Sequence, residues 1–497
     1  MTVDNRYRIP LFILVVLTTA FRLIYINFIE LVPDEAYYWD LSRRLQLSYY
    51  DHPPMLMYLI SLFTGALGNT EFVVRLPSVI IGSTVTVTVY LLGKDLFDEK
   101  IGFYSALLAN ITLIYSIGGI LATVDTPFAL FWLLASYSGV RAIKTGVGMW
   151  WYLNGIALGL GMLSKYIMVL FVPAFLIFLL LSKGHRHWLR RKEPYIGSAI
   201  ALLTFSPVII WNARNDWASF KFQLTHGLEV KRKAGFPSFL EYIGSQAGIV
   251  SPFLFIACVW AMIMSSIAWF REKDWRYLLL SSLSSFVVLF FGYSSLRAKV
   301  EGNWPMSAYF TAIIALVSLY FKSDYQRKKV FATAVAATAV ILTIFVHIQA
   351  VSPLITIKKD PTNELHRWQE LGLETGKVLN ELQHQKEFDN SKGLFIMATS
   401  HQVASELSFY IPSKPYVYEL AGEGKFNQYN MWAGPQKGAD ALLVSSPGRE
   451  DDAYINSLFD EITEIKRIEP MRNGKVIKTY AVSYCRNFHG FRDKASN

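Results

Sequence analysis

Two carboxylates follow the first apolar run of the chain. Asp34 and Glu35 lie in the segment Val32–Asp40, where Tyr37, Tyr38 and a tryptophan follow them. Tyrosine and tryptophan favour the boundary between membrane and water. A carboxylate in such a partly dry place can act as a general base towards a hydroxyl group. A solvated start of a helix has the same composition, so the residue types alone leave both interpretations open.

Two further charged side chains lie at the ends of other apolar runs. Asp125 precedes Thr126-Pro127 and can serve either as a second catalytic acid or as an ordinary helix N-cap. Lys165 has strongly apolar sequence on both sides. A lysine there is costly unless it faces a cavity or extends to the interface, and a phosphate is a natural partner for it. Extension of the side chain to the interface is the alternative.

The later loops carry weaker signals. His226 can join Asp51 and Asp34 as ligands of a divalent metal ion, because imidazole and carboxylate together suit several metals. Arg297, Lys299 and Glu301 precede Asn303-Trp304-Pro305 at the start of another apolar run, and these charged residues either line a pocket or anchor a helix at the interface.

The composition indicates what positions these residues. The 497 residues are 53% hydrophobic and 17% charged, with a mean hydropathy of +0.29, whereas soluble domains carry roughly 25% charged residues. An ordinary soluble enzyme and a disordered chain are therefore disfavoured. The net charge of +10 lies between apolar runs, which indicates membrane topology and no nucleic-acid partner. Cys258 and Cys485 are too few for a disulfide framework or a cysteine-based zinc site.

We predict an all-α polytopic membrane protein with about eleven spanning helices, and up to about 13. The expected spans are 10–28, 72–93, 101–121, 125–142, 150–164, 166–182, 195–213, 246–269, 277–294, 304–321 and 330–351. The first run is expected to be a retained anchor, because no small-residue cleavage site follows it. The short apolar stretch 53–68, which opens with two prolines, is expected to be an interfacial helix.

The distribution of Lys and Arg predicts a cytoplasmic N-terminus. An odd number of spans then places the outer loops 29–71 and 214–245, and the segment 352–497, on the periplasmic side. We therefore divide the chain into a membrane domain, 1–351, and a small soluble α/β domain, 352–497. In that domain we expect helices at 361–386 and 401–410, and strands at Gly393–Thr399, Tyr416–Glu419, Ala441–Ser445 and Val476–Tyr484.

Several motifs in order resemble the GT-C type of membrane glycosyltransferase. They include Asp34-Glu35 with Tyr37-Tyr38, the run Tyr49–Pro54, the run Glu71–Pro77, Asp125 with Pro127, Leu163–Lys165, Asn303–Pro305 and Ala404–Pro412. More closely, they are similar to the bacterial branch of the protein-O-mannosyltransferase superfamily, which includes the aminoarabinose and galacturonosyl transferases of lipid A and lipopolysaccharide core.

The resemblance implies roles for individual residues. The donor would be one sugar on a polyprenyl (undecaprenyl) phosphate, transferred with inversion to lipid A, a core glycan or another envelope acceptor. Asp34 would be the general base, supported by Glu35 and Asp125. The donor phosphate would be bound by Lys165, His52 and Arg75. The acceptor pocket would hold Tyr37, Tyr38, Tyr50, Arg297, Lys299 and Asn303. Asp51 and His226 would hold a divalent metal ion, if one is required. Many relatives have lysine where this chain has His52, which is partly neutral at pH 7.

Other functions share parts of this pattern. An oligosaccharide ligase or a protein O-glycosyltransferase would use the same core chemistry on another acceptor. A transporter or flippase for a lipid-linked sugar also places charges in spans, but it often shows internal repeats, which this sequence lacks. A membrane anchor that presents the C-terminal domain would make Asp34, Asp125 and Lys165 expendable.

Overall fold

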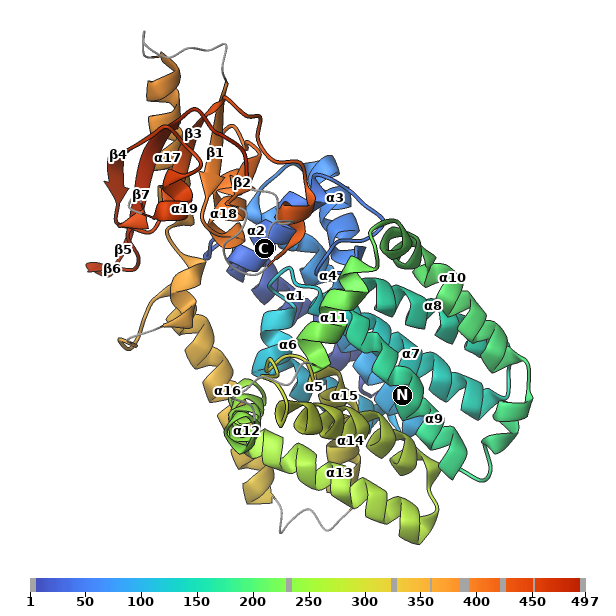
Figure 1. Ribbon diagram of the computed structural model, residues 1–497. Coiled ribbons are helices and arrows are strands. Elements are labelled where there is room, and N and C mark those ends of the chain that lie inside the picture. The colour runs from blue at the N-terminus through green and yellow to red at the C-terminus, as the bar shows by residue number, and fades with distance from the viewer. Residues whose placement is uncertain are drawn as a thin grey trace. The chain divides into compact units, whose positions relative to one another are not determined.

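The computed structural model describes residues 6–228, 235–322, 329–357, 360–384, 393–420, 426–449 and 452–491. The chain forms two compact units (Figure 1). The first unit contains residues 1–26, 46–59 and 75–348, and the second contains 27–45, 60–74 and 349–497. Two segments of the first long loop thus belong to the same unit as the C-terminal domain.

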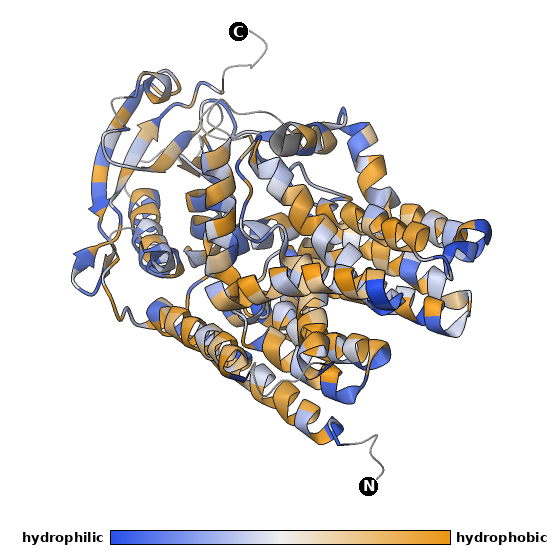
Figure 2. Cartoon of the chain, turned by 90° about the horizontal axis from the view of Figure 1, so that it is seen from below, coloured by the Kyte–Doolittle hydropathy of each residue, from blue (hydrophilic) through white to orange (hydrophobic). Residues whose placement is uncertain are grey.

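The first unit is a bundle of helices. Its helices are α1 (Arg8–Tyr25), most of α4 (Glu71–Leu96), α5 (Glu99–Asn110), α6 (Leu113–Gly118), α7 (Asp125–Thr145), α8 (Met149–Ser164), η2 (Tyr166–Leu170), α9 (Phe171–Leu181), η3 (Arg186–Arg190), α10 (Glu193–Arg214), α11 (Ala218–Leu228), α12 (Phe236–Val250), α13 (Pro252–Glu272), α14 (Trp275–Ser295), α15 (Met306–Lys322) and most of α16 (Lys329–Val351). Apolar residues dominate these helices along most of their length (Figure 2).

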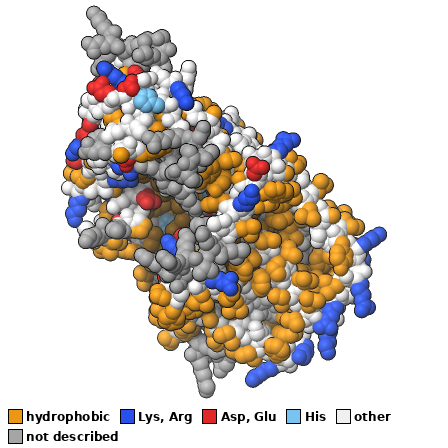
Figure 3. Space-filling view, in the orientation of Figure 1, with side chains coloured by type: hydrophobic (Ala, Val, Ile, Leu, Met, Phe, Trp, Pro, Cys, Tyr) orange, Lys and Arg blue, Asp and Glu red, His pale blue; other side chains and the backbone are white. Residues whose placement is uncertain are grey.

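Six of the described helices are long and apolar enough to cross a membrane by length and composition. They are α1, α4, α10, α13, α14 and α16. Hydrophobic side chains also cover much of the visible face of the bundle, with Lys and Arg along its edge (Figure 3). Leu203, Ile263 and Leu289 on this unit are more than half exposed. Since water disfavours such a surface, the chain is a multi-pass membrane protein. The number of spans stays a prediction.

Two expected spans are wrong in their bounds. The run 101–121 is not one helix, because Thr112 adopts an extended conformation and separates α5 from α6. The run 246–269 is also broken: Ser251 has a φ of 87°, and α13 begins at Pro252, whose ring suits a first helical position. Residues expected to form the outer loop 214–245 are therefore largely helical, in α11 and α12.

Helices α8 and α10 approach each other at glycines. A Cβ atom on Gly155 would lie 2.1 Å from the carbonyl oxygen of Gly197, which is far below contact distance. We therefore expect Gly155→Ala to destabilise the bundle by about 1–3 kcal/mol, measured as a lower thermal midpoint of the purified chain in detergent. Gly248→Ala on α12 is the matched control, because a Cβ there meets nothing within 4 Å. Equal midpoints for both variants would contradict this close packing.

The second unit is built around a five-stranded sheet in the order β2-β1-β3-β7-β4. The strands are β1 (Leu394–Ala398), β2 (Val417–Glu419), β3 (Asp440–Ser445), β4 (Glu461–Ile468) and β7 (Tyr480–Arg486), and β5 (Met471–Arg472) and β6 (Lys475–Val476) form a separate hairpin. Strands β1, β2 and β3 are parallel, whereas β7 is antiparallel to both β3 and β4. Met397 lies opposite Leu443 in the register.

The expected C-terminal elements are mostly present. Helix α18 (His401–Tyr410) has the expected bounds and is capped by Ser400, whose hydroxyl accepts a hydrogen bond from the amide of Val403. Helix α17 (Trp368–His384) is shorter than expected, and η5 (Pro361–Leu365) precedes it. The expected strand 476–484 is divided between β6 and β7, and β4 was missed. The second unit also holds α2 (Pro33–Ser42), most of α3 (Met55–Leu67), η6 (Gln428–Met431) and α19 (Ala453–Asn456).

Candidate active site

Asp125 lies at the first position of α7 and is 8% exposed. It was expected either to cap the helix or to do chemistry, and the structure excludes the cap. The N-cap is Val124, and no side-chain cap hydrogen bond forms there. Both carboxylate oxygens instead bind side chains of other elements. The helix N-terminus also favours a negative charge at this position.

Lys165 is the first partner of Asp125. Its ammonium donates to Oδ1 of Asp125 at 2.6 Å. The lysine can reach this carboxylate because α8 ends at Ser164, as the sequence predicts, and Lys165 takes an extended conformation before η2 begins. Its side chain is 14% exposed and that of Asp125 is 12% exposed. The lysine therefore does not extend to solvent; it forms a largely buried ion pair.

Asn303 is the second partner. Its amide Nδ2 donates to Oδ2 of Asp125 at 2.6 Å, three residues before α15 begins. Three residues from widely separated parts of the sequence thus meet in the first unit. All three were candidate site residues. Since a buried charge is costly without partners, the carboxylate, the ammonium and the amide hold each other in place.

A second group of candidates surrounds residues 48–52 of the same unit. The ring of Tyr50 lies 4.9 Å from that of Phe222 on α11, and the Gln223 amide donates to the carbonyl of Asp51 at 2.9 Å. Tyr166, next to Lys165, hydrogen bonds with Ser219 on the same helix at 2.8 Å. The start of η2 and the 48–52 segment are therefore both held against α11.

The remaining candidates of the first unit have other surroundings. Arg75 on α4 is fully buried, and its Nη1 donates to the carbonyl of Ile26 at 3.1 Å. Arg297 and Lys299 are exposed; the first donates to the Tyr293 hydroxyl, and the second lies 3.4 Å from Glu301. The backbone carbonyl of His52 accepts from the amide of Tyr49. Roles for all four in binding substrate stay predictions.

The predicted metal ligands are only partly described. His226 lies on α11, three residues after Gln223, but its side chain is outside the described residues. Within the described parts of the chain, no group of three or more His, Cys, Asp and Glu side chains is placed to hold a metal ion.

Helix α2 of the second unit carries the acidic pair. Asp34 is exposed at the second position of the helix, whereas Glu35 is fully buried. The amide of Val32 donates to Oε2 of Glu35 at 3.1 Å, so this carboxylate stabilises the start of the helix. The two neighbouring acids therefore have different surroundings. Of these two acids, Asp34 is the one whose side chain is exposed.

Tyr37 and Tyr38 are buried in the second unit. The Tyr37 ring lies 5.2 Å from that of His401 and 5.7 Å from that of Tyr429, and its hydroxyl accepts from the amide of Gln428. Contact of these tyrosines with an acceptor stays a prediction.

One turn further along α2, a buried network holds Asp40. This carboxylate accepts from the Tyr429 hydroxyl at 2.7 Å and lies 3.0 Å from Nε of Arg43. Burial raises the pKa of Asp40 above its usual range, and Arg43 opposes that shift. The network fixes α2, and with it Asp34, on the C-terminal domain.

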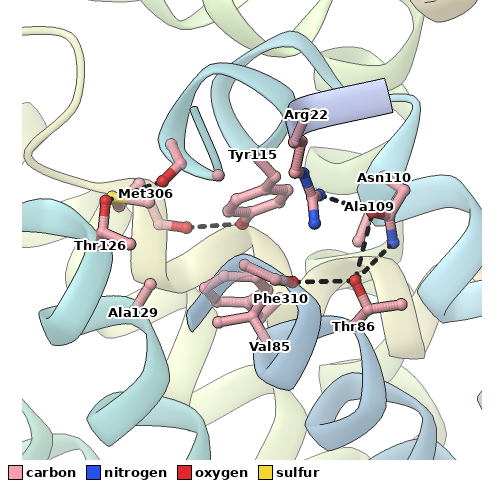
Figure 4. Close-up of a pocket in the computed structure, with 13 residues that line it drawn as sticks. Arg22, Val85, Thr86, Ala109, Asn110, Tyr115, Thr126, Ala129, Met306 and Phe310 are labelled. Atoms are coloured by element: carbon pink, nitrogen blue, oxygen red, sulfur yellow. Dashed lines mark hydrogen bonds between the residues drawn. The ribbon is translucent and has the colours of Figure 1, made fainter. Parts of the chain in front are cut away.

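Sequence reasoning missed one polar cluster of the first unit. Arg22, Asn110 and Thr86 lie together around a cavity (Figure 4). The available signal was Arg22 itself, because an arginine inside a spanning run seldom lacks a function.

Comparisons with known proteins show what this chain is similar to. Residues 51–211 match the family described as dolichyl-phosphate-mannose-protein mannosyltransferase. The lipid A galacturonosyltransferase RgtD of Rhizobium johnstonii is 28% identical over 61% of this chain and 64% of its own length. An undecaprenyl phosphate-α-4-amino-4-deoxy-L-arabinose arabinosyl transferase of Sodalis glossinidius is 30% identical over 34% of each chain. The chain thus spans less than two thirds of these relatives.

The fold likeness extends over nearly the whole chain. The crystal structure of ArnT from Cupriavidus metallidurans bound to undecaprenyl phosphate superposes with a TM-score of 0.65. It covers 96% of this chain and 98% of that one, at 13% identity. The fold is therefore of the GT-C type. In sequence the chain is similar to the family matched over residues 51–211 and to the transferases named above.

Proposed function

We propose that the chain is a glycosyltransferase that moves one sugar from a polyprenyl phosphate to an envelope acceptor. The observation that carries this proposal is the buried cluster of Asp125, Lys165 and Asn303. The relatives support it, because the names of those compared include a lipid A galacturonosyltransferase and a transferase that uses an undecaprenyl phosphate sugar. The preferred acceptor is lipid A or lipopolysaccharide core.

Such a transfer needs few chemical groups. The acceptor hydroxyl oxygen attacks the anomeric carbon, and the bond from that carbon to the phosphate oxygen breaks. The polyprenyl phosphate leaves with the electron pair, and the hydroxyl proton goes to a carboxylate. No nucleotide and no further reactant is needed. The protein must supply a base and positive charge at the leaving phosphate.

We assign these tasks to different parts of the chain. Asp34 is the proposed base, because its carboxylate is exposed at the start of α2. Lys165 is the proposed partner of the leaving phosphate. Asp125 holds its ammonium in place until the donor binds, and Asn303 orients the Asp125 carboxylate. His52 and Arg75 are further proposed phosphate contacts. The transfer is proposed to invert the configuration at the anomeric carbon.

A divalent metal ion is a further proposed component of the donor-binding site. Asp51 and His226 would hold it, and it would neutralise charge on the phosphate. The fit is reasonable, because Gln223 binds the Asp51 backbone and lies on the helix that carries His226.

Metal removal tests this addition. If a metal is required, chelation followed by verified removal should lower turnover by about 10-fold or more, and Asp51→Asn should reduce metal content and turnover together. Elemental analysis of the purified protein gives the first quantity. Full turnover of a verified metal-free protein would reject the requirement while leaving the transferase proposal intact.

We also propose that the protein lies in the bacterial inner membrane with a cytoplasmic N-terminus and a periplasmic C-terminal domain. Cysteine labelling of introduced exposed sites, at Gly184 and at Gln436 for example, with a membrane-impermeant reagent would test it. We expect labelling of intact spheroplasts only at position 436.

Mass spectrometry of envelope lipids and glycans tests the function itself. Cells without the gene should lack one sugar on one acceptor, and wild type but not Asp34→Asn should restore it. The mass difference names both the sugar and the acceptor. A modified protein in place of a lipid would indicate a protein O-glycosyltransferase. Accumulation of lipid-linked sugar with no product lost in any fraction would favour a flippase and overturn the proposal.

A further inference from the structure

A small cavity lies inside the first unit, close to the cluster of Asp125. Its wall includes Thr126, the residue after Asp125, and Met306, three residues after Asn303. Two side-chain hydrogen bonds join these walls: the Tyr115 hydroxyl donates to the Met306 carbonyl at 2.8 Å, and the Thr126 hydroxyl donates to the Gly118 carbonyl at 2.7 Å. The cavity thus shares its walls with the elements that carry the candidate active site.

Arg22 of α1 supplies the charge in this cavity. Its guanidinium points from α1 towards Tyr115, Phe310 and Thr86 (Figure 4). The side chain is 4% exposed, and Nη2 donates to Oδ1 of Asn110 at 2.8 Å. Nη1 is buried and has no hydrogen-bond partner among the described residues, which also supply no carboxylate to Arg22. An arginine stays protonated, so a positive charge is buried here without a counter-ion.

Two glycines make room for this side chain. A Cβ atom on Gly119 would lie 2.6 Å from Nε of Arg22, and one on Gly82 would lie 3.1 Å from Nη1. Helix α4 and the end of α6 can hold the guanidinium only because both positions lack a side chain. The position is therefore built for arginine and is not a gap that a long side chain happens to fill.

A buried, unpaired cation in a membrane-spanning bundle is costly, so an anionic ligand is its natural partner. The cavity has a volume of about 20 Å³, which suits one or two water-sized groups and excludes a sugar ring. A carboxylate has this size. The wall opposite the guanidinium is aromatic, because Tyr115 and Phe310 stack at 4.1 Å.

We propose that Arg22 binds the carboxylate of an acidic donor sugar, so that the transferred unit is a uronic acid. This inference rests on the proposed function and names its substrate class. Lys165 and Arg22 then bind the two anionic groups of one donor, with the phosphate at Lys165 and the carboxylate at Arg22. A cationic amino sugar is disfavoured at this position, because Arg22 repels it.

Donor binding to the full-length protein in nanodiscs tests the proposal. The probes are undecaprenyl phosphate alone and undecaprenyl phosphate carrying galacturonic acid, galactose, glucuronic acid, glucose or 4-amino-4-deoxyarabinose. Within one acid and hexose pair, the carboxylate replaces a hydroxymethyl group and little else changes. We expect wild type to bind one uronosyl lipid about 100-fold more tightly than its parent hexosyl lipid, and Arg22→Gln to remove that difference.

Binding of undecaprenyl phosphate without a sugar shows whether Arg22 binds a carboxylate or the lipid phosphate. Arg22→Gln should leave its affinity within about threefold of wild type. If Arg22→Gln weakens this probe as much as the uronosyl lipid, the site binds phosphate and the carboxylate assignment is overturned. Equal affinities of wild type for the acid and the hexose in both pairs also overturn it. If wild type binds the hexosyl lipids and transfers their sugar, the proposed transferase function is retained although the carboxylate assignment is wrong.

A second variant tests the proposal independently if Arg22→Gln does not fold. Gly119→Ala retains the arginine and its charge but displaces the guanidinium, since its Cβ would lie 2.6 Å from Nε. It should reduce the preference for the uronosyl lipid at unchanged affinity for undecaprenyl phosphate, and Gly118→Ala, whose Cβ meets nothing within 4 Å, should not. Thermal unfolding of each variant in the same nanodiscs checks its fold. An unchanged preference in a folded Gly119→Ala variant would contradict the proposal.

Discussion

Replacing Asp34 with asparagine is expected to lower the rate of sugar transfer by about 10³-fold while the chain remains folded. The amide keeps the shape of the carboxylate but cannot accept the proton of the acceptor hydroxyl. Because the side chain is exposed on α2, its charge contributes little to packing. Donor affinity should therefore stay close to wild type, and the loss should appear in the turnover of bound donor.

Single-turnover assays with preloaded donor measure this step. The neighbouring acid gives a contrast, because Glu35 is buried and its Oε2 accepts from the Val32 amide. Glu35→Gln can retain that hydrogen bond through its amide oxygen, so turnover should fall far less than in Asp34→Asn. If Asp34→Asn turns over at a rate near wild type, Asp34 is not the base. A loss of donor affinity with turnover unchanged would assign Asp34 to binding.

The sequence singles out three residues that the structure brings together, and the reason is physical. Asp125 and Lys165 each interrupt apolar sequence at the end of a helix, and Asn303 lies shortly before the next apolar helix. A charge such as that of Asp125 or Lys165 is costly in that position unless it has a partner, so its residue type alone indicates a built environment. The break at Lys165 is visible in the same way. Which partner each group takes is set by helix packing, and that information is absent from local spacing.

Other features depend on tertiary contacts and could not be read from composition. The run 246–269 is predominantly apolar, yet Ser251 with its positive φ divides it into α12 and α13. Glu35 looks like Asp34 in sequence but is buried by its neighbours. Strand β4 was missed because its isoleucines, Ile462, Ile465 and Ile468, are spaced by three residues and not by two, and its register shifts between Glu464 and Lys466.

The ion pair of Asp125 and Lys165 gives the second large expected effect. Lys165→Met removes the cation and leaves the Asp125 carboxylate largely buried with only the Asn303 amide. We expect a loss of about 3–5 kcal/mol in the free energy of unfolding, because one buried charge then lacks its counter-ion. The affinity for undecaprenyl phosphate should also fall, by about 100-fold, if Lys165 binds the phosphate.

A double variant separates these two effects. Adding Asp125→Asn to Lys165→Met removes the second charge, so most of the lost stability should return, whereas donor affinity should stay low. The measurements are the unfolding midpoint in detergent and the Kd for undecaprenyl phosphate, each for wild type, both single variants and the double variant. Coupling in stability isolates the pair itself. If the double variant binds undecaprenyl phosphate as tightly as wild type, Lys165 only neutralises Asp125 and the phosphate must be bound by other cations, of which Arg75 and His52 are the first to test.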